Sequence, residues 1–78
     1  MNPDVIAVTP EPEYLLRLEF ANGEVRRYDV KPLLDFGVFK ALRNPALFNG
    51  ARVCDGTTEW PNEVDICPDA LYEESVAA

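Results

Sequence analysis

Residues 14–30 have the sequence YLLRLEFANGEVRRYDV, in which two segments of alternating apolar and polar residues flank the pair Asn22-Gly23. Alternation with a period of two is typical of a half-buried strand. An Asn-Gly pair between two such segments is a strong signal for a tight turn. The sequence therefore predicts a β-hairpin with strands over 14–20 and 24–30.

The two turns that fit this hairpin differ in register by one residue. A two-residue Asn-Gly turn would place Leu18 opposite Arg27, whereas a type I turn with a left-handed bulge at Gly23 places Leu16 opposite Tyr28. A slip of one residue moves every side chain to the other face, so we expect the register that pairs apolar residues. It predicts a positive φ at Gly23 and one shared buried face, formed by Tyr14, Leu16, Leu18, Phe20, Tyr28 and Val30.

The segments on either side of this hairpin predict short elements only. In chain order they are a strand over 5–8, short helical pieces between 29 and 48, a second hairpin over 52–60, a short strand over 64–66 and a helix over 68–74. Pro10 and Pro12 should end the first strand, because proline cannot donate to a ladder. The order β-β-β-α-β-β-α predicts an α+β fold. We expect a small antiparallel sheet of about five short strands, made of two hairpins and the N-terminal strand, with short helices on one side.

Length and composition favour one soluble domain over residues 1–78. Hydrophobic residues make up 47% of the chain, which is enough for a compact core and too many for a disordered chain. No apolar run approaches the ~20 residues that span a bilayer. The N-terminal residues 1–4 lack the basic and apolar regions of a signal peptide. A cytoplasmic location is therefore expected.

The net charge of -7 is concentrated at one end of the chain. Residues 1–52 contain seven acids and all seven bases, whereas residues 53–78 contain seven acids and no base. Those acids are Asp55, Glu59, Glu63, Asp65, Asp69, Glu73 and Glu74. Such a segment repels nucleic acid and is compatible with a basic protein partner. A simpler interpretation is that the acidic end keeps a small domain soluble.

No residue set typical of an enzyme active site is present. The chain has no histidine, so Ser75, its single serine, has no base to activate it. Cys67 precedes a predicted helix, which favours a thiolate, but Asp65 and Asp69 flank it and oppose one. Asp29 and Asp65 are candidates for paired-carboxylate chemistry, although capping the next amides is a sufficient role for each. We expect no catalytic residue.

No metal or other cofactor is expected either. Cys54 and Cys67 lack CxxC spacing, and a chain without histidine lacks the usual remaining ligands of structural zinc. Both thiols are expected to be reduced, unligated and buried as small hydrophobic side chains. The four glycines are too dispersed for a phosphate-binding loop: Gly23, Gly37, Gly50 and Gly56.

Two aromatic residues lie within the acidic segment. Trp60 and Tyr72 suit an aromatic binding surface. Trp60 equally suits the core, as an anchor for the second hairpin. Together with their acidic neighbours they predict an interaction surface of seven residues: Trp60, Glu63, Asp65, Asp69, Tyr72, Glu73 and Glu74.

The chain also resembles a known family. Residues 20–29 contain the pattern F-x-N-G-E-x-R-x-Y-D, and residues 60–75 contain Trp60, then D-I-x-P-D-x-L-Y from Asp65, then Ser75. With Leu42, Phe48 and Val53 between them, these residues resemble the bacterial domain of unknown function numbered 2442, over about residues 5–75. The resemblance implies a small α+β domain whose gene often neighbours that of another small protein, with a suggested toxin–antitoxin role. It implies no catalytic residue, because none is established for the family.

Three functions remain open. The leading hypothesis is a non-enzymatic protein-interaction module, such as the acidic partner of a small basic protein from the same operon. The second is a small-ligand binder or minor enzyme that uses carboxylates near Trp60 and Asp65. The third is an accessory nucleic-acid role for Arg17, Arg26 and Arg27, against which the net charge argues.

An open sheet edge is expected as well. Residues 5–8 carry no charge that would keep a second strand away. This predicts a homodimer formed through a sheet edge or an adjoining apolar patch, with the acidic segment outside the interface.

Overall fold

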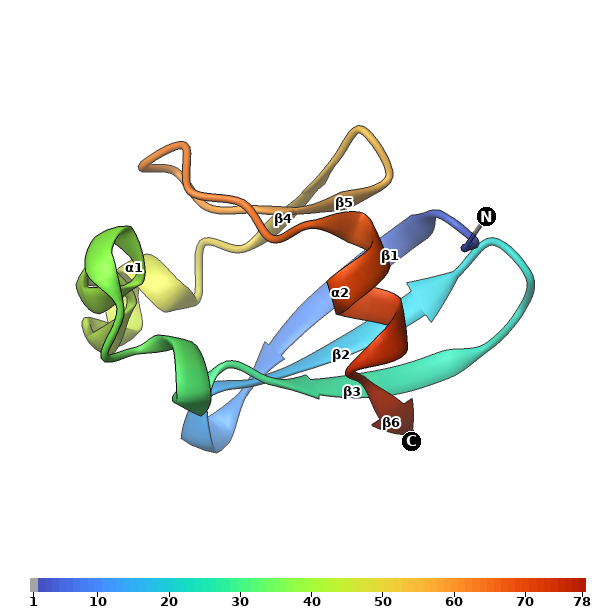
Figure 1. The fold of residues 1–78 in the computed structure, drawn as a ribbon, viewed down its shortest axis with the longest axis horizontal. Coiled ribbons are helices and arrows are strands. Elements are labelled where there is room, and N and C mark those ends of the chain that lie inside the picture. The colour runs from blue at the N-terminus through green and yellow to red at the C-terminus, as the bar shows by residue number, and fades with distance from the viewer. Residues whose placement is uncertain (1) are drawn as a thin grey trace.

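The computed structural model describes residues 2–78 and places the strands in two antiparallel sheets (Figure 1). The larger sheet has the order β1-β2-β3-β6, with β1 (Val5–Glu11), β2 (Leu15–Phe20), β3 (Val25–Asp29) and β6 (Val76–Ala77). The smaller sheet is the hairpin of β4 (Arg52–Cys54) and β5 (Thr57–Glu59). The α+β class is confirmed, with the strands divided between two sheets.

The helices are all short. They are η1 (Pro12–Tyr14), η2 (Lys31–Leu33), η3 (Gly37–Arg43), α1 (Pro45–Phe48) and α2 (Pro68–Glu73). Proline occupies the first or second position of every helix except η3, because its fixed φ suits a position whose N–H has no partner within the helix. Asn44 caps α1 by accepting a hydrogen bond from the Ala46 N–H at 3.1 Å. The predicted helical pieces between 29 and 48 and the predicted closing helix are therefore present.

The register of the central hairpin follows the apolar pairing. Gly23 has a φ of 89°, and Leu16 lies opposite Tyr28. The Val30 N–H donates to the Tyr14 carbonyl at 3.0 Å, which extends the same register beyond the strand ends. Of the six side chains expected on one face, five are buried and Tyr14 is half-buried. The bulged turn is thus confirmed.

Three boundaries differ from the prediction. Strand β1 continues through Pro10 to Glu11. As an edge strand whose neighbour in the sheet is β2, it tolerates a residue without an N–H. Tyr14 belongs to η1 and not to the strand. Residues 64–66 form no strand and contribute one isolated bridge, between Asp65 and Glu59.

Strand β6 was not predicted, and it closes the free side of β3. Val76 pairs with Arg27, and Ala77 pairs with Arg26. The Arg26 guanidinium fixes Ser75, the residue directly before β6. Its Nε donates to Ser75 Oγ at 2.7 Å, and its Nη2 donates to the Ser75 carbonyl at 2.6 Å. The buried Ser75 hydroxyl in turn donates to the Tyr72 carbonyl at 2.7 Å.

The core lies between the larger sheet, α2 and the β4–β5 hairpin (Figure 1). Trp60 is fully buried there, and its Nε1–H donates to the Phe48 carbonyl at 2.9 Å. This confirms Trp60 as an anchor for the second hairpin. Helix α2 packs on the sheet through Leu71, which is fully buried, and through the edge of Tyr72, whose ring centroid lies 5.0 Å from that of Phe20.

Candidate functional site

Ion pairs neutralise most of the charge in the first two thirds of the chain. Six pairs form among residues 2–78: Arg17–Glu19, Arg26–Glu24, Arg27–Glu11, Lys31–Asp29, Arg43–Asp35 and Arg52–Glu59. These pairs use every basic residue except Lys40. Only one of them, Arg52–Glu59 at 2.9 Å, involves an acid from residues 53–78.

The other acids of the last third have no basic partner within 4.0 Å among the described residues. They are Asp55, Glu63, Asp65, Asp69, Glu73 and Glu74, and all six are exposed. We call these six residues the acidic surface. Because their carboxylates are solvated and unpaired, they can accept cations from a partner without first breaking an internal ion pair.

Part of the acidic surface surrounds the β4–β5 hairpin. The pKa of the Cys54 thiol lies above its ordinary value of 9.0, chiefly because of the charge on Glu59 and then because of burial and the charge on Asp55. Asp65 acts in the same direction, whereas Arg52 opposes it. The raised pKa of the Cys54 thiol therefore indicates a negative electrostatic potential at the hairpin.

Another part of the acidic surface lies on α2. The Asn2 side-chain amide donates to Asp69 Oδ1 and to Glu73 Oε2, each at 3.2 Å. These two carboxylates lie one turn apart on the same side of the helix. They bring the N-terminal segment of the chain alongside α2.

The structure separates the seven residues of the predicted interaction surface. Trp60 is buried, so its side chain cannot belong to a surface. Tyr72 is half-buried and is used internally: its hydroxyl donates to Glu24, and the Arg26 guanidinium carbon lies 4.8 Å from its ring centre. The remaining five acids are exposed: Glu63, Asp65, Asp69, Glu73 and Glu74.

The hydrogen bond from Tyr72 also affects Glu24. Glu24 has a pKa below the ordinary 4.5, first because of the Tyr72 hydrogen bond and then because of a hydrogen bond from Asn22.

The two cysteines are less buried than expected. Cys67 is exposed and Cys54 is half-buried, so the prediction of two buried thiols is wrong. Cys67 is the N-cap residue of α2 and directly follows the buried Ile66. Among residues 2–78 no group of three or more Cys, Asp or Glu side chains has a metal-binding arrangement.

The remaining candidates have structural surroundings. Asp29 accepts from the Lys31 N–H at 2.9 Å from the position before Val30, the N-cap residue of η2, and so bonds the next amides as predicted. No side chain of the described residues caps α2, so the capping role predicted for Asp65 is wrong. The three arginines of the first hairpin do not form one patch. Arg26 points toward Ser75, while Arg17 and Arg27 lie opposite each other in the register and pair with separate glutamates.

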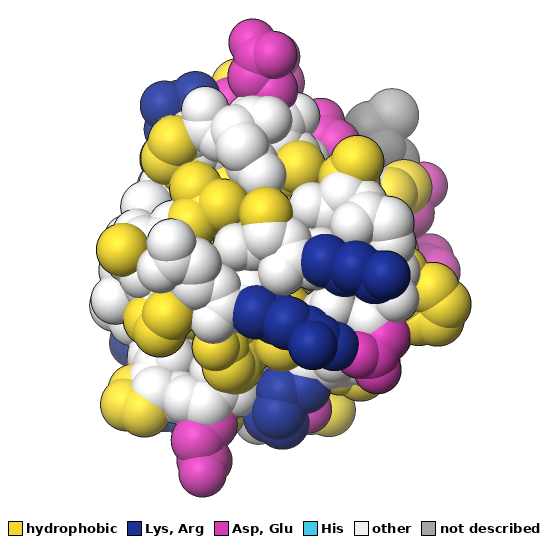
Figure 2. Space-filling model, turned by 90° about the vertical axis from the view of Figure 1, so that its left-hand side faces the viewer, with side chains coloured by type: hydrophobic (Ala, Val, Ile, Leu, Met, Phe, Trp, Pro, Cys, Tyr) yellow, Lys and Arg dark blue, Asp and Glu magenta, His cyan; other side chains and the backbone are white. Residues whose placement is uncertain are grey.

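One end of the molecule has a different character. Figure 2 shows this face, the left-hand side of Figure 1, where apolar side chains and a group of basic side chains lie among white backbone and other atoms, with acidic side chains mainly near the edges. Two of the most exposed large hydrophobic side chains among the described residues belong to the segment around η3, Phe36 at 65% and Val38 at 66%. Lys40, on η3 itself, is the base that has no ion-pair partner among the described residues.

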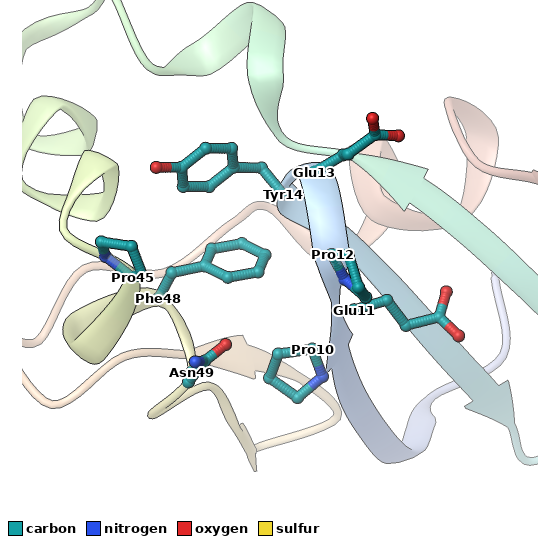
Figure 3. A pocket seen from close by; sticks show the side chains of 8 residues that line it. All are labelled: Pro10, Glu11, Pro12, Glu13, Tyr14, Pro45, Phe48 and Asn49. Carbon is teal, nitrogen blue, oxygen red and sulfur yellow. The ribbon is translucent and has the colours of Figure 1, made fainter.

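A pocket of about 360 Å³ opens between the β1–β2 connection and α1 (Figure 3). It is lined by residues 10–14, Pro45, Phe48 and Asn49. Neither Trp60 nor Asp65, the centre of the predicted ligand site, lines it. Sequence analysis did not find this pocket because its two walls lie far apart in the chain. The sequence feature that could have indicated the pocket is its three prolines, at positions 10, 12 and 45.

No helix among the described residues is both long and apolar enough to cross a membrane.

Comparison with known proteins places the chain in a family. Neither the curated proteins nor the solved structures contain a significant match to the chain. The model of one family, described as a protein of unknown function (DUF2442), matches residues 5–77. With nearly its whole length matched, the chain belongs to the DUF2442 family.

Proposed function

We propose that this domain is a non-enzymatic protein-interaction module that binds a basic protein through the acidic surface. The observation that carries the proposal is the distribution of ion pairs. Every base except Lys40 is paired with an acid, while the six carboxylates of the acidic surface have no basic partner within 4.0 Å among the described residues. A partner of opposite charge is the natural complement of such a surface.

The distribution also predicts how binding behaves. Exposed charges steer an oppositely charged partner during encounter, so association should be fast at low salt and slower as salt is added. The family resemblance suggests the biological form of this proposal, an antitoxin-like protein that neutralises a basic product of a neighbouring gene. In that role the domain needs a surface and no chemistry.

The alternative of a small-ligand binder or minor enzyme near Trp60 has less support. Its aromatic group is buried, and the indole N–H is already bonded to the Phe48 carbonyl. Asp65 is exposed, and the residue that it pairs with in an isolated bridge, Glu59, already has its carboxylate bound to Arg52 at 2.9 Å.

The proposal is tested by affinity capture from a lysate of the native host. The bait is wild-type domain, an acidic-surface variant (Asp69→Asn with Glu73→Gln) or a matched variant (Glu19→Gln with Asp35→Asn). Both variants change the net charge equally, but the matched variant alters two acids outside the acidic surface that already have basic partners, half-buried Glu19 and exposed Asp35. The proposal predicts one basic protein captured by the wild type and the matched variant and lost by the acidic-surface variant. Equal capture by all three baits, or no enrichment by the wild type, would refute it.

A further inference from the structure

The pocket between the β1–β2 connection and α1 is walled by rings. Figure 3 shows the rings of Tyr14, Phe48 and the three prolines 10, 12 and 45 around it, with Asn49 at its side. Its volume of about 360 Å³ lies within the range of sites that hold small ligands or single peptide segments. The wall is therefore apolar and has one side-chain amide for orientation.

These rings are held in place before any ligand binds. The Tyr14 hydroxyl donates to the Arg43 carbonyl at 2.5 Å, and its ring meets Phe48 edge-on with centroids 5.2 Å apart. Phe48 is 2% exposed, and its carbonyl accepts from the Trp60 indole. The proline rings lose little conformational entropy when a ligand binds. A ligand would thus meet a preorganised wall, which lowers the entropic cost of binding.

The backbone at the pocket is strained. Glu13 and Tyr14 are consecutive non-glycine residues with φ of 66° and 60°, a left-handed conformation that is unfavourable for residues with a Cβ. The surroundings hold it: the Lys31 ammonium donates to the Glu13 carbonyl at 2.9 Å, and the Val30 N–H to the Tyr14 carbonyl at 3.0 Å. Such strain tends to persist at ligand sites, and here it accompanies the turn of the Tyr14 ring toward α1.

The charges of the lining have one sign. Glu11 and Glu13 are the charged residues that line the pocket, and no base does. Glu11 is paired with Arg27 at 2.8 Å, whereas Glu13 has no basic partner within 4.0 Å among the described residues. In Figure 3 both carboxylates point away from the rings, which leaves the interior apolar and the rim negative.

We propose that this pocket binds a short extended segment of another protein that contains proline next to a lysine or arginine. Proline-rich segments adopt the polyproline II conformation, dock on ring-lined grooves and keep their carbonyls free for a donor such as the Asn49 amide. The basic residue meets the rim at Glu13. This site shares no residue with the acidic surface, so either proposal can fail without the other.

The test uses defined peptides and the ¹⁵N-labelled domain. The probe is a capped oligoproline peptide with one central arginine, compared with the same peptide carrying glutamate and with a glycine–serine peptide of equal length. Nuclear magnetic resonance titration should show saturable shifts centred on the amides of Glu13, Tyr14 and Asn49 for the arginine peptide. The glutamate peptide should bind more weakly, and the glycine–serine peptide should cause no saturable shift.

Two variants with matched controls locate the site. Pro45→Ala removes a ring from the wall at the start of α1 and should weaken binding about fivefold. Pro32→Ala, at an exposed proline in the first turn of η2, should leave it unchanged. Glu13→Gln should weaken binding of the arginine peptide about two- to fivefold. Glu63→Gln alters an exposed glutamate of the same left-handed conformation, φ 67°, outside the pocket and should have no effect.

Several results would overturn the proposal. One is the absence of saturable shifts for the arginine peptide, and another is shifts centred outside residues 10–14 and 45–49. Equal effects of the paired variants, or equal affinity for the arginine and glutamate peptides, would also refute it. Occupation of the pocket by a second copy of the domain, detected as concentration-dependent shifts at these residues without peptide, would do the same.

Discussion

Two neighbouring threonines on β5 show how single residues balance this small core. Both are buried, Thr57 at 7% exposure and Thr58 at 0%. The Thr57 hydroxyl donates to the Ile66 carbonyl at 2.6 Å and ties the hairpin to the segment before α2. The Thr58 hydroxyl has no hydrogen-bond partner among the described residues. A buried polar group without a hydrogen-bond partner lowers the stability of the fold, whereas a buried polar group with a partner contributes to it.

Replacement of each threonine by valine should therefore have opposite effects. Thr58→Val should raise the free energy of unfolding by about 1 kcal/mol, because it removes an unpaired hydroxyl and keeps the shape. Thr57→Val should lower it by about 1 kcal/mol, because the Ile66 carbonyl loses its donor. Urea denaturation of the two variants measures both changes. Equal destabilisation by the two substitutions would contradict this account of the hairpin.

Glu24 should make stability depend on acid pH. Its folded-state pKa is lowered from 4.5 by the Tyr72 hydroxyl first, and then by Asn22 and Arg26. A lowered folded-state pKa gives a contribution to stability that is complete above the unfolded pKa and is lost as pH falls through the folded pKa. Glu24→Gln should therefore destabilise the domain at neutral pH, and the difference from wild type should be smaller at a pH below 4.5. Urea midpoints at the two pH values check this, and a pH-independent difference would argue against it.

At the scale of elements, the position of β6 in the sheet depends on a side-chain contact more than on the backbone pairing of so short a strand. It has two residues, and both are exposed. The backbone pairing is extended by the Ala78 N–H, which donates to the Val25 carbonyl at 3.1 Å. The contact of Arg26 with Ser75 sets the chain on this path.

Loss of the Ser75 hydroxyl should detach β6. Ser75→Ala removes a hydrogen bond from a charged donor and should cost about 1–2 kcal/mol. Amide hydrogen exchange at Ala78 should become faster by more than the global loss of stability explains. Val76→Thr, an exposed substitution in the same strand, is the control and should change stability by less than about 0.5 kcal/mol. Unchanged exchange at Ala78 in Ser75→Ala would show that the pairing holds without the contact.

The elements differ in how far their sequence predicts them. The hairpin over 14–30 was predicted with its register, because alternation and a bulged turn at Gly23 are local signals. The continuation of β1 through Pro10 was not, since a proline is tolerated only when the strand lies at an edge, which the topology decides. A two-residue strand such as β6 has no periodicity to detect.

At the scale of the whole molecule, the sequence predicted the excess of acids but not its arrangement. That bases and acids of the first two thirds pair with each other follows from the register and the tertiary contacts. The burial of Trp60 separates it from the acids near it in sequence. The pocket joins residues 10–14 to residues 45–49, and the contact between such distant segments is decided by tertiary packing.

Self-association remains a prediction at this scale. β1 is an edge of the larger sheet, and Ile6 is 60% exposed on it. The Val5 N–H is bonded to the Gly56 carbonyl, and Pro10 has no N–H, so residues 6–9 form the open part of the edge. We predict a homodimer through this edge or an adjoining apolar patch. Ile6→Lys, which places a charge on the edge, should shift it toward monomer.

Sedimentation velocity at micromolar concentration measures both forms. A strictly monomeric wild type would refute dimerisation. A dimer with its interface centred on residues 63–74 would refute the electrostatic argument, because that contact would bring two unpaired acidic segments together.

The role of the acidic surface is tested most directly by a hydrogen-exchange footprint. Amide exchange of the domain is measured by mass spectrometry, alone and in complex with the basic protein that it captures. We predict slower exchange in the complex centred on residues 63–74, with less protection as salt is raised. Protection absent from these residues and located on β1, or on the Phe36 and Val38 end of the molecule, would contradict the proposed function.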